Sequence, residues 1–215
     1  MDKFLEKYEQ EYARWLEADE IDHSSKVIPV LESLEAKQWV LPTQQAIDIL
    51  QNARSFAVTS CVCRSHYKRC SHPLEVCFIL NDLGDRLIDQ KKAKRVNLEG
   101  AEEIIKIANK SGLVHMSLYR PSREIFALCN CCQCCCHDLQ LLMKHGRRDL
   151  VAQADFIAVC DDDLCSNCGL CIERCMFMAR YWSEDQVTYS PDACYGCGLC
   201  MTTCPEEAIA MEPRH

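Results

Sequence analysis

The sequence predicts an α+β fold, with N-terminal helices, a small mixed domain rich in cysteine, and a second small domain at the C-terminal end. Two observations predict it. Apolar residues recur at helical spacing in some segments and form short alternating or continuous runs in others. The 19 cysteines among the 215 residues also fall into separate groups, which divide the chain into three parts, 1–55, 56–150 and 151–215.

The first part contains no cysteine and is expected to be mainly helical. Five of its apolar residues recur near helical spacing: Phe4, Tyr8, Tyr12, Trp15 and Leu16. They predict an amphipathic helix that packs either on the rest of this protein or in the groove of a partner. A second helix is predicted to have Thr43 as its N-cap. Its apolar face would consist of Ala46, Ile47, Leu50 and Ala53, and a short strand would follow at 56–58.

The middle part has the pattern of an ordinary folded domain between its cysteines. Residues 74–88 are predicted to be helical, and Asn97 is predicted to cap a second helix that stops at Ser111 and Gly112. The inward face of that second helix would consist of Ala101, Ile104, Ile105 and Ala108. Strands are predicted at 114–119 and 124–128. A helix at 138–145, ended by Gly146, would precede the link to the third part.

Eight cysteines of the third part repeat one spacing twice. In each repeat three cysteines are separated by two residues, and a fourth follows after three more. The two sets are Cys165, Cys168, Cys171 and Cys175, then Cys194, Cys197, Cys200 and Cys204. This spacing is typical of proteins that hold two cubane [4Fe-4S] clusters. Zinc knuckles are the alternative, because two-residue gaps also suit zinc, but zinc sites use cysteines in pairs.

The fourth cysteine of each repeat is expected to bind the cluster of the other repeat. One cluster would then be held by Cys165, Cys168, Cys171 and Cys204, and the other by Cys194, Cys197, Cys200 and Cys175. Because the two clusters would share ligand segments, they should lie close enough to exchange electrons.

Residues from about 151 to the end resemble a bacterial-type ferredoxin domain with two [4Fe-4S] clusters. The resemblance includes Ser166-Asn167, Gly169-Leu170 and the segment 195–199 around Cys197. One departure follows the first repeat, where Met176 stands in place of the proline that follows Cys204. The resemblance implies a ferredoxin-like fold and electron transfer as the activity.

Ten further cysteines lie in the middle part, in two groups far apart in the sequence. The first group is Cys61, Cys63, Cys70 and Cys77, and the second is Cys129, Cys131, Cys132, Cys134, Cys135 and Cys136. We expect them to bind one or two additional iron–sulfur clusters of unknown type, with ligands from both groups.

Two alternatives remain open for these ten thiols. A zinc or copper store of the metallothionein kind would use adjacent cysteines in the same way, but such stores lack the apolar helices and strands predicted here. A structural zinc site could also include His66, His72 or His137. Cys160 belongs to neither group and stays unassigned, either as a small buried apolar residue or as a spare thiol.

The segment from about residue 26 onward resembles a cysteine-rich module that precedes ferredoxin domains in iron–sulfur proteins of anaerobic bacteria and archaea. The matching segments are 56–64, 70–77, 112–115 and 129–136. The resemblance implies cluster binding and electron transfer without a known substrate. Arg64, beside Cys63, could donate a hydrogen bond to a cluster sulfide or an anionic ligand.

Composition favours some functions and excludes others. The formal charge of −8 favours docking on the basic face of a redox partner and argues against nucleic-acid binding. The N-terminal residues show no apolar leader, and no apolar run is long enough to span a membrane. The number of cysteines is odd, which favours a reducing compartment over a set of disulfides, so we expect a cytoplasmic protein. No nucleotide-binding glycine motif occurs. The oligomeric state is not predicted.

The sequence therefore predicts a low-potential, multi-cluster electron carrier that connects a redox partner with an upstream cluster site. The alternative is an iron–sulfur reductase whose upstream cluster has an open position and reduces a small molecule. A redox or metal sensor is a third possibility, which the absence of a basic recognition helix disfavours.

Overall fold

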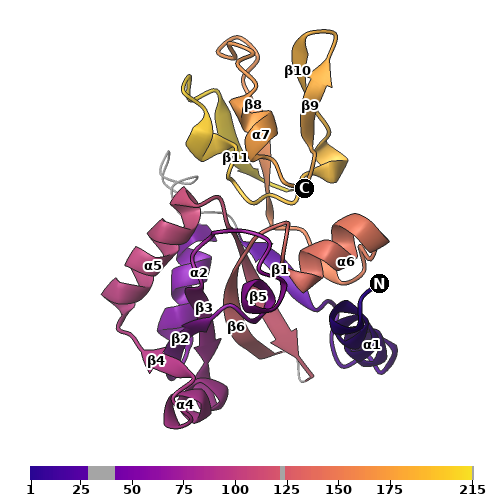
Figure 1. Cartoon of the computed structure of the whole chain (residues 1–215). Helices are drawn as coiled ribbons and strands as arrows, with labels where there is room; N and C mark the ends of the chain where they lie inside the picture. The colour runs from indigo at the N-terminus through magenta and orange to yellow at the C-terminus, as the bar shows by residue number, and fades with distance from the viewer. Residues whose placement is uncertain (29–41, 122–123, 215) are drawn as a thin grey trace.

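The computed structural model describes residues 1–28, 42–121 and 124–214 (Figure 1). Its α-helices are α1 (Lys3–Glu17), α2 (Pro42–Asn52), α3 (Val62–Tyr67), α4 (Asn81–Asp89), α5 (Leu98–Lys110), α6 (His137–His145) and α7 (Leu170–Arg174). Its strands are β1 (Ser25–Ile28), β2 (Phe56–Ser60), β3 (Glu75–Leu80), β4 (Ala93–Arg95), β5 (Val114–Arg120), β6 (Glu124–Cys131), β7 (Val151–Ala152), β8 (Phe156–Cys160), β9 (Arg180–Ser183), β10 (Gln186–Tyr189) and β11 (Ile209–Pro213).

A seven-stranded sheet forms the body of the molecule, in the order β4-β2-β3-β6-β5-β1-β7. Its strands pair antiparallel, except that β1 and β7 pair parallel. The sheet thus draws strands from residue 25 to residue 152. The three-part division of the chain by cysteine groups stays a prediction.

Helices cover both faces of this sheet, because adjacent residues of a strand point to opposite sides. On β6, Ala127 packs in the core that includes α1 and α6, whereas Leu128 packs in the core with α2 and α5. The helix α1 lies beside α6 in Figure 1, on the side opposite α5. Burial on both faces fixes the register of the strands that carry the cysteines.

The C-terminal region is a smaller unit at one end of the sheet (Figure 1). It contains the antiparallel pairs β8–β11 and β9–β10 and the short helix α7. An exposed ion pair joins it to the sheet, with Lys26 Nζ 2.6 Å from Asp155 Oδ1. Arg174 also donates a hydrogen bond of 2.7 Å to the carbonyl of Asn109, at the end of α5.

Most of the elements predicted from the sequence are present. The helix predicted from the N-terminal aromatic residues is α1, and it packs on this protein's own α6, where the ring of Tyr8 stacks on His137. The α5 helix has Asn97 as its N-cap, with the side chain accepting a hydrogen bond from Gly100 N–H. The α6 helix ends at Gly146, which adopts the left-handed conformation with φ 68°.

Two sequence predictions are wrong. Residues 74–88 are not one helix, because Glu75–Leu80 form β3 and only the remainder is α4. This run contains Val76, Phe78 and Ile79, and it lies between two other strands of the sheet, where residues with high β-propensity pack well. Thr43 is not an N-cap, because α2 already includes it.

Candidate metal centres

Two cavities in the C-terminal region are each lined by four of the eight repeated cysteines. The inner cavity is lined by Cys175, Cys194, Cys197 and Cys200. The outer cavity is lined by Cys165, Cys168, Cys171 and Cys204, with Cys160 beside them. Each cavity therefore combines three cysteines of one repeat with the fourth cysteine of the other.

Glycines allow the chain to wrap closely around these cavities. Gly196 has φ 70°, and a Cβ atom there would lie 2.0 Å from the carbonyl oxygen of Phe156, so a larger residue does not fit. The same turn points the Gly196 N–H at the sulfur of Cys194, at 3.4 Å. Amide groups directed at thiolate sulfur stabilise negative charge, as a bound iron–sulfur cluster requires.

A buried cation lies beside the inner cavity. Arg180 is almost completely buried, and two of its guanidinium nitrogens, Nε and one terminal nitrogen, have no hydrogen-bond partner among the described residues. Its guanidinium lies 4.6 Å from the ring centre of Tyr189. Burial opposes its charge, but Cys200 and Cys171 together raise the pKa of Arg180 above its usual value. A cation held in this way fits a strongly anionic group in the cavity.

These two cavities, four cysteines each, have the donor set of two cubane clusters. Residues 164–209 match the family of 4Fe-4S dicluster domains. The chain is thus an α+β protein with a small cysteine-rich part and a C-terminal ferredoxin-type domain that binds iron–sulfur clusters. A comparison of the whole chain with curated proteins gave no significant match.

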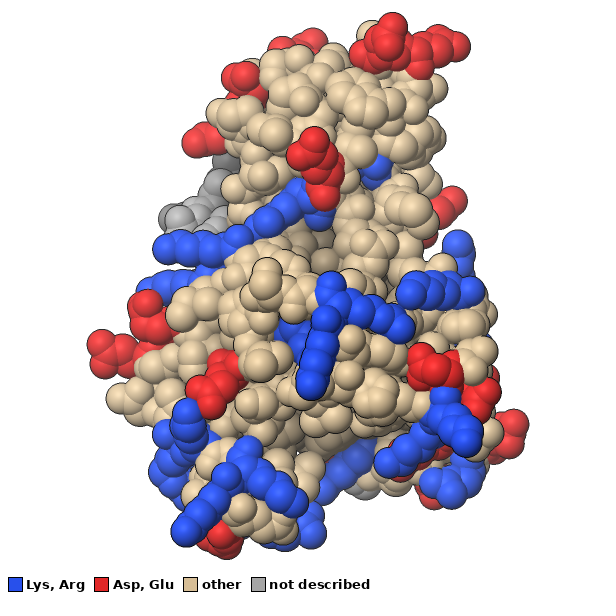
Figure 2. Space-filling model, viewed as in Figure 1, with Lys and Arg blue, Asp and Glu red and all other residues tan. Residues whose placement is uncertain are grey.

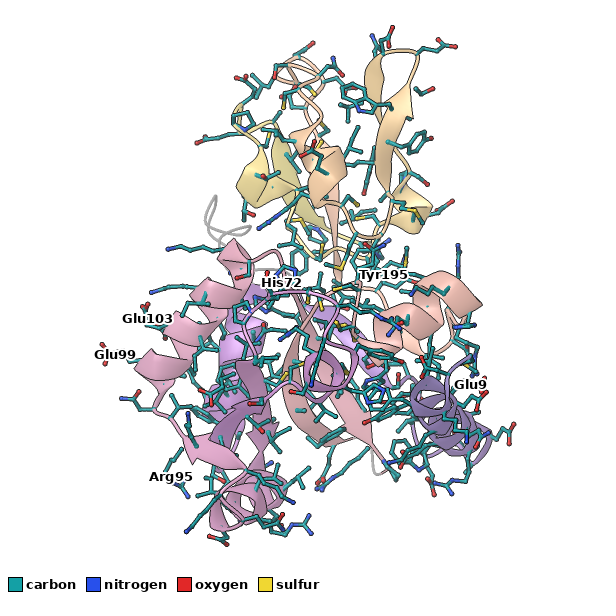
Figure 3. All side chains as sticks on the ribbon, in the orientation of Figure 1. Glu9, His72, Arg95, Glu99, Glu103 and Tyr195 are labelled. Atoms are coloured by element: carbon teal, nitrogen blue, oxygen red, sulfur yellow. The ribbon has the colours of Figure 1, made fainter. Side chains whose placement is uncertain are left out.

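The two cavities of the dicluster domain differ in their exposure. Around the outer cavity Cys168 is exposed and Cys165 half-buried, whereas Cys194, Cys197 and Cys200 of the inner cavity are all buried. The rings of Phe177 and Tyr195 stack at 4.7 Å and form part of the inner wall. Figure 3 shows Tyr195 at the junction between the dicluster domain and the sheet. The inner cavity therefore faces the rest of the protein, and the outer cavity faces solvent.

Six cysteines of the upstream part form a closed ring of thiols, here called the six-thiol ring. Each thiol lies close enough to the next to shift its pKa, and the last lies close enough to the first, in the order Cys61, Cys63, Cys136, Cys131, Cys129 and Cys77. Five of the six are buried, and Cys129 is half-buried.

The sheet explains why these six thiols meet. The end of β2, the start of β3 and the end of β6 lie at the same end of neighbouring antiparallel strands. Cys61 follows β2 directly, Cys77 lies on β3, and Cys129 lies on β6 two residues before Cys131. Because side chains alternate along a strand, Cys129 and Cys131 point to the same face. The sequence separates these residues by up to 75 positions, but the strand pairing brings them together.

The thiols of the ring fall into two alternating sets, one with lowered and one with raised pKa values. In the first set the pKa of Cys61 is lowered to about 2, chiefly by the thiol of Cys63, and the pKa of Cys129 to about 5, chiefly by the thiol of Cys131. The pKa of Cys136 is lowered as well. The pKa values of the other three thiols are raised, chiefly by their neighbours in the ring. The first set favours the thiolate form, which is the form that binds metal.

One histidine supports the ring from outside. The Nδ1 atom of His137 lies 2.9 Å from the sulfur of Cys63, and its Nε2 atom lies 2.7 Å from the hydroxyl of Tyr12. Tyr8 stacks on the same imidazole with 3.9 Å between ring centres. Both ring nitrogens of His137 therefore have partners. The sequence predicts the aromatic face of α1 but gives it no function. In the structure this face packs against His137, beside the six-thiol ring.

The other four upstream cysteines form a second, tighter group. The sulfur atoms of Cys70, Cys132, Cys134 and Cys135 all lie within 4.8 Å of one another. None of His66, His72 and His137 belongs to this group, and His66 stacks instead on Phe4 at 4.0 Å. The structure thus divides the ten upstream cysteines into six and four.

A buried arginine lies between the two groups. Arg64 is only 2% exposed, donates a hydrogen bond of 2.9 Å to the carbonyl of Asn130, and lies 3.7 Å from the sulfur of Cys132. Burial opposes its charge, but Cys61 of the six-thiol ring and Cys132 of the four-thiol group raise the pKa of Arg64 above its usual value. The sequence indicated that Arg64 could approach an anionic group, but not that it would lie between two of them.

Proposed function

We propose that this chain is an electron-transfer protein, in which the dicluster domain connects an external redox partner with a further iron–sulfur centre held by the six-thiol ring. The observation that carries the proposal is that the inner cavity and the ring share one apolar core. Cys131 and Cys136 of the ring pack in the same core as Phe177, Tyr195 and Cys197. A bound iron–sulfur cluster would supply reversible one-electron storage at each site.

The residues that line the three sites indicate the order in which electrons would pass through them. The exposed Cys168 brings the outer cavity to the surface, the inner cavity has three buried cysteines and borders Phe177 and Tyr195, and these two rings pack in the same core as Cys131 and Cys136 of the six-thiol ring. The proposed ligand sets of the dicluster domain are those that line its cavities, which supports the arrangement of bacterial-type ferredoxins.

The charge of the protein favours a basic partner at the outer cavity. Residues 151–215 contain eleven acidic and three basic side chains, a formal charge of −8, so the first 150 residues are neutral as a whole. Figure 2 shows acidic side chains around the end of the molecule where this domain lies. Near Cys168, the apolar side chains of Leu164, Leu170 and Trp182 are about half exposed. Exposed apolar side chains on an acidic domain fit a redox partner with a basic face.

Two further properties belong to the proposal. All 19 cysteines are free thiols in the structure, which fits a reducing compartment such as the cytoplasm. Within the described residues, no helix has the length and apolar character needed to cross a membrane.

Counting the electrons that the loaded protein takes up tests this function. Stepwise anaerobic reduction is expected to store more electrons per chain than the dicluster domain can hold. Replacing Cys129 by alanine should remove the electrons held at the six-thiol ring and leave those of the dicluster domain, because this substitution opens the ring without touching either cavity. Val62→Ala is the matched control, since Val62 is exposed and carries no thiol. Electron uptake that Cys129→Ala leaves unchanged would contradict the proposal.

A further inference from the structure

The four-thiol group of Cys70, Cys132, Cys134 and Cys135 differs in geometry from every other set of cysteines described. The sulfur of Cys70 lies 3.9 Å from that of Cys132 and 3.9 Å from that of Cys135. Among the described residues, no other group of histidine, cysteine or acidic side chains brings its ligand atoms so close together.

These distances match one metal ion rather than a cluster. A tetrahedral zinc ion with metal–sulfur bonds of about 2.3 Å holds its four sulfurs about 3.8 Å apart. In a cubane each thiolate binds a different iron at a different corner, so the four thiolates lie further apart. The dicluster domain gives the comparison within the same molecule, because its eight cysteines line two cavities in sets of four and form no group of this tightness.

We propose that Cys70, Cys132, Cys134 and Cys135 bind a single tetrahedral metal ion, zinc or iron, in a closed site separate from the six-thiol ring. Four thiolates on a divalent ion carry a net charge of −2. Arg64, whose guanidinium lies 3.7 Å from the sulfur of Cys132, places a buried positive charge where that excess would be. The positive charge of Arg64 would therefore offset part of the negative charge of this metal site, on the side of Arg64 that faces away from the six-thiol ring.

The loop that supplies three of the ligands is held in place by side chains outside it. Arg69 donates hydrogen bonds to the carbonyl of Cys134 at 3.2 Å and to Gln140 Oε1 at 2.8 Å. Gln140 in turn donates to the carbonyl of Cys135 at 3.1 Å. Support of this kind around a metal site orients its ligands before the ion binds.

The position of the site indicates a structural role. The metal ion would join Cys70, in the loop after α3, to the loop between β6 and α6. Each of these two loops is flanked in the sequence by thiols of the six-thiol ring. Fixing them together would hold Cys63 and Cys136, which are neighbours in the ring, in place. With four thiols assigned to a single ion, six thiols remain for an iron–sulfur centre, which is enough for one cluster and not for two cubanes. This inference does not require the ring to carry electrons.

Two neighbouring cysteines allow a matched test. Replacing Cys134 by alanine is expected to remove about one metal ion per chain, zinc or iron, with no loss of acid-labile sulfide. Replacing Cys136 by alanine, two residues further along, is expected to remove several irons together with sulfide, because Cys136 belongs to the ring. The metal and sulfide contents of both variants would be measured on anaerobically purified full-length protein.

Loss of several irons and equal sulfide from the Cys134 variant would overturn the proposal, and so would an unchanged metal content. If either variant fails to fold, X-ray absorption on the unaltered protein decides. A zinc or mononuclear iron component with four sulfurs at about 2.3 Å and no neighbouring metal supports the single-ion site. Absence of such a component refutes it.

Discussion

Replacing Cys175 by alanine is expected to remove the whole cluster of the inner cavity and to spare the cluster of the outer cavity. Cys175 lies in the first repeat, but it lines the cavity formed by the second. Replacing Cys171, four residues earlier in the same repeat, should have the opposite result, because Cys171 lines the outer cavity. Each variant should lose about four irons per chain, as measured by iron and sulfide analysis of anaerobic protein.

Double variants make this test independent of any assignment of spectra. If ligation is crossed, Cys175→Ala combined with Cys197→Ala loses no more iron than Cys175→Ala alone, since both residues would bind one cluster. Cys175→Ala combined with Cys171→Ala should lose both clusters. Ligation within each repeat predicts the reverse pattern, in which the second pair loses one cluster and the first pair loses two.

Replacing Arg64 by methionine is expected to destabilise the upstream part strongly. Methionine keeps much of the side-chain volume but leaves the surrounding thiolates without their buried cation. Removing one partner of a buried ion pair costs about 3–5 kcal/mol. Unfolding of the loaded protein at a fixed guanidinium concentration should therefore become faster by at least about tenfold, followed by the loss of cluster absorbance.

Arg54 offers a matched control for this substitution. It forms ion pairs with Asp82 and Asp85, but its side chain is 65% exposed. Exposed pairs contribute about 0–1 kcal/mol, so Arg54→Met should change the unfolding rate little. Equal changes in the unfolding rate of the two variants would contradict this prediction, because the charge of Arg64 would then contribute no more to stability than an exposed ion pair does.

The dicluster domain could be predicted from the sequence because its ligands are local. Seven residues of one repeat supply three cysteines to one cavity, so the spacing alone describes most of the site. The capped helices α5 and α6 were predictable for a similar reason, since Asn97 and Gly146 act within one turn of the chain.

The division of the upstream cysteines could not be predicted, because it depends on strand pairing. In the run from Cys129 to Cys136, adjacent residues belong to different groups: Cys131 to the ring and Cys132 to the four-thiol group. Strand alternation offers one local signal, since it groups Cys129 with Cys131. No local signal brings Cys70 to Cys132 or Cys61 to Cys77. The incorrect prediction of one helix at 74–88 has the same origin, because residues 75–80 form a strand by pairing with β2 and β6.

The central claim is that the upstream cysteines hold an iron–sulfur centre in addition to the two clusters of the dicluster domain. Iron, acid-labile sulfide and zinc per chain, measured on anaerobically purified protein, test it most directly. The structure predicts clearly more than the roughly eight irons and eight sulfides that two cubanes contain. About eight of each, with zinc as the only other metal, would contradict the claim and leave the six-thiol ring without a cluster.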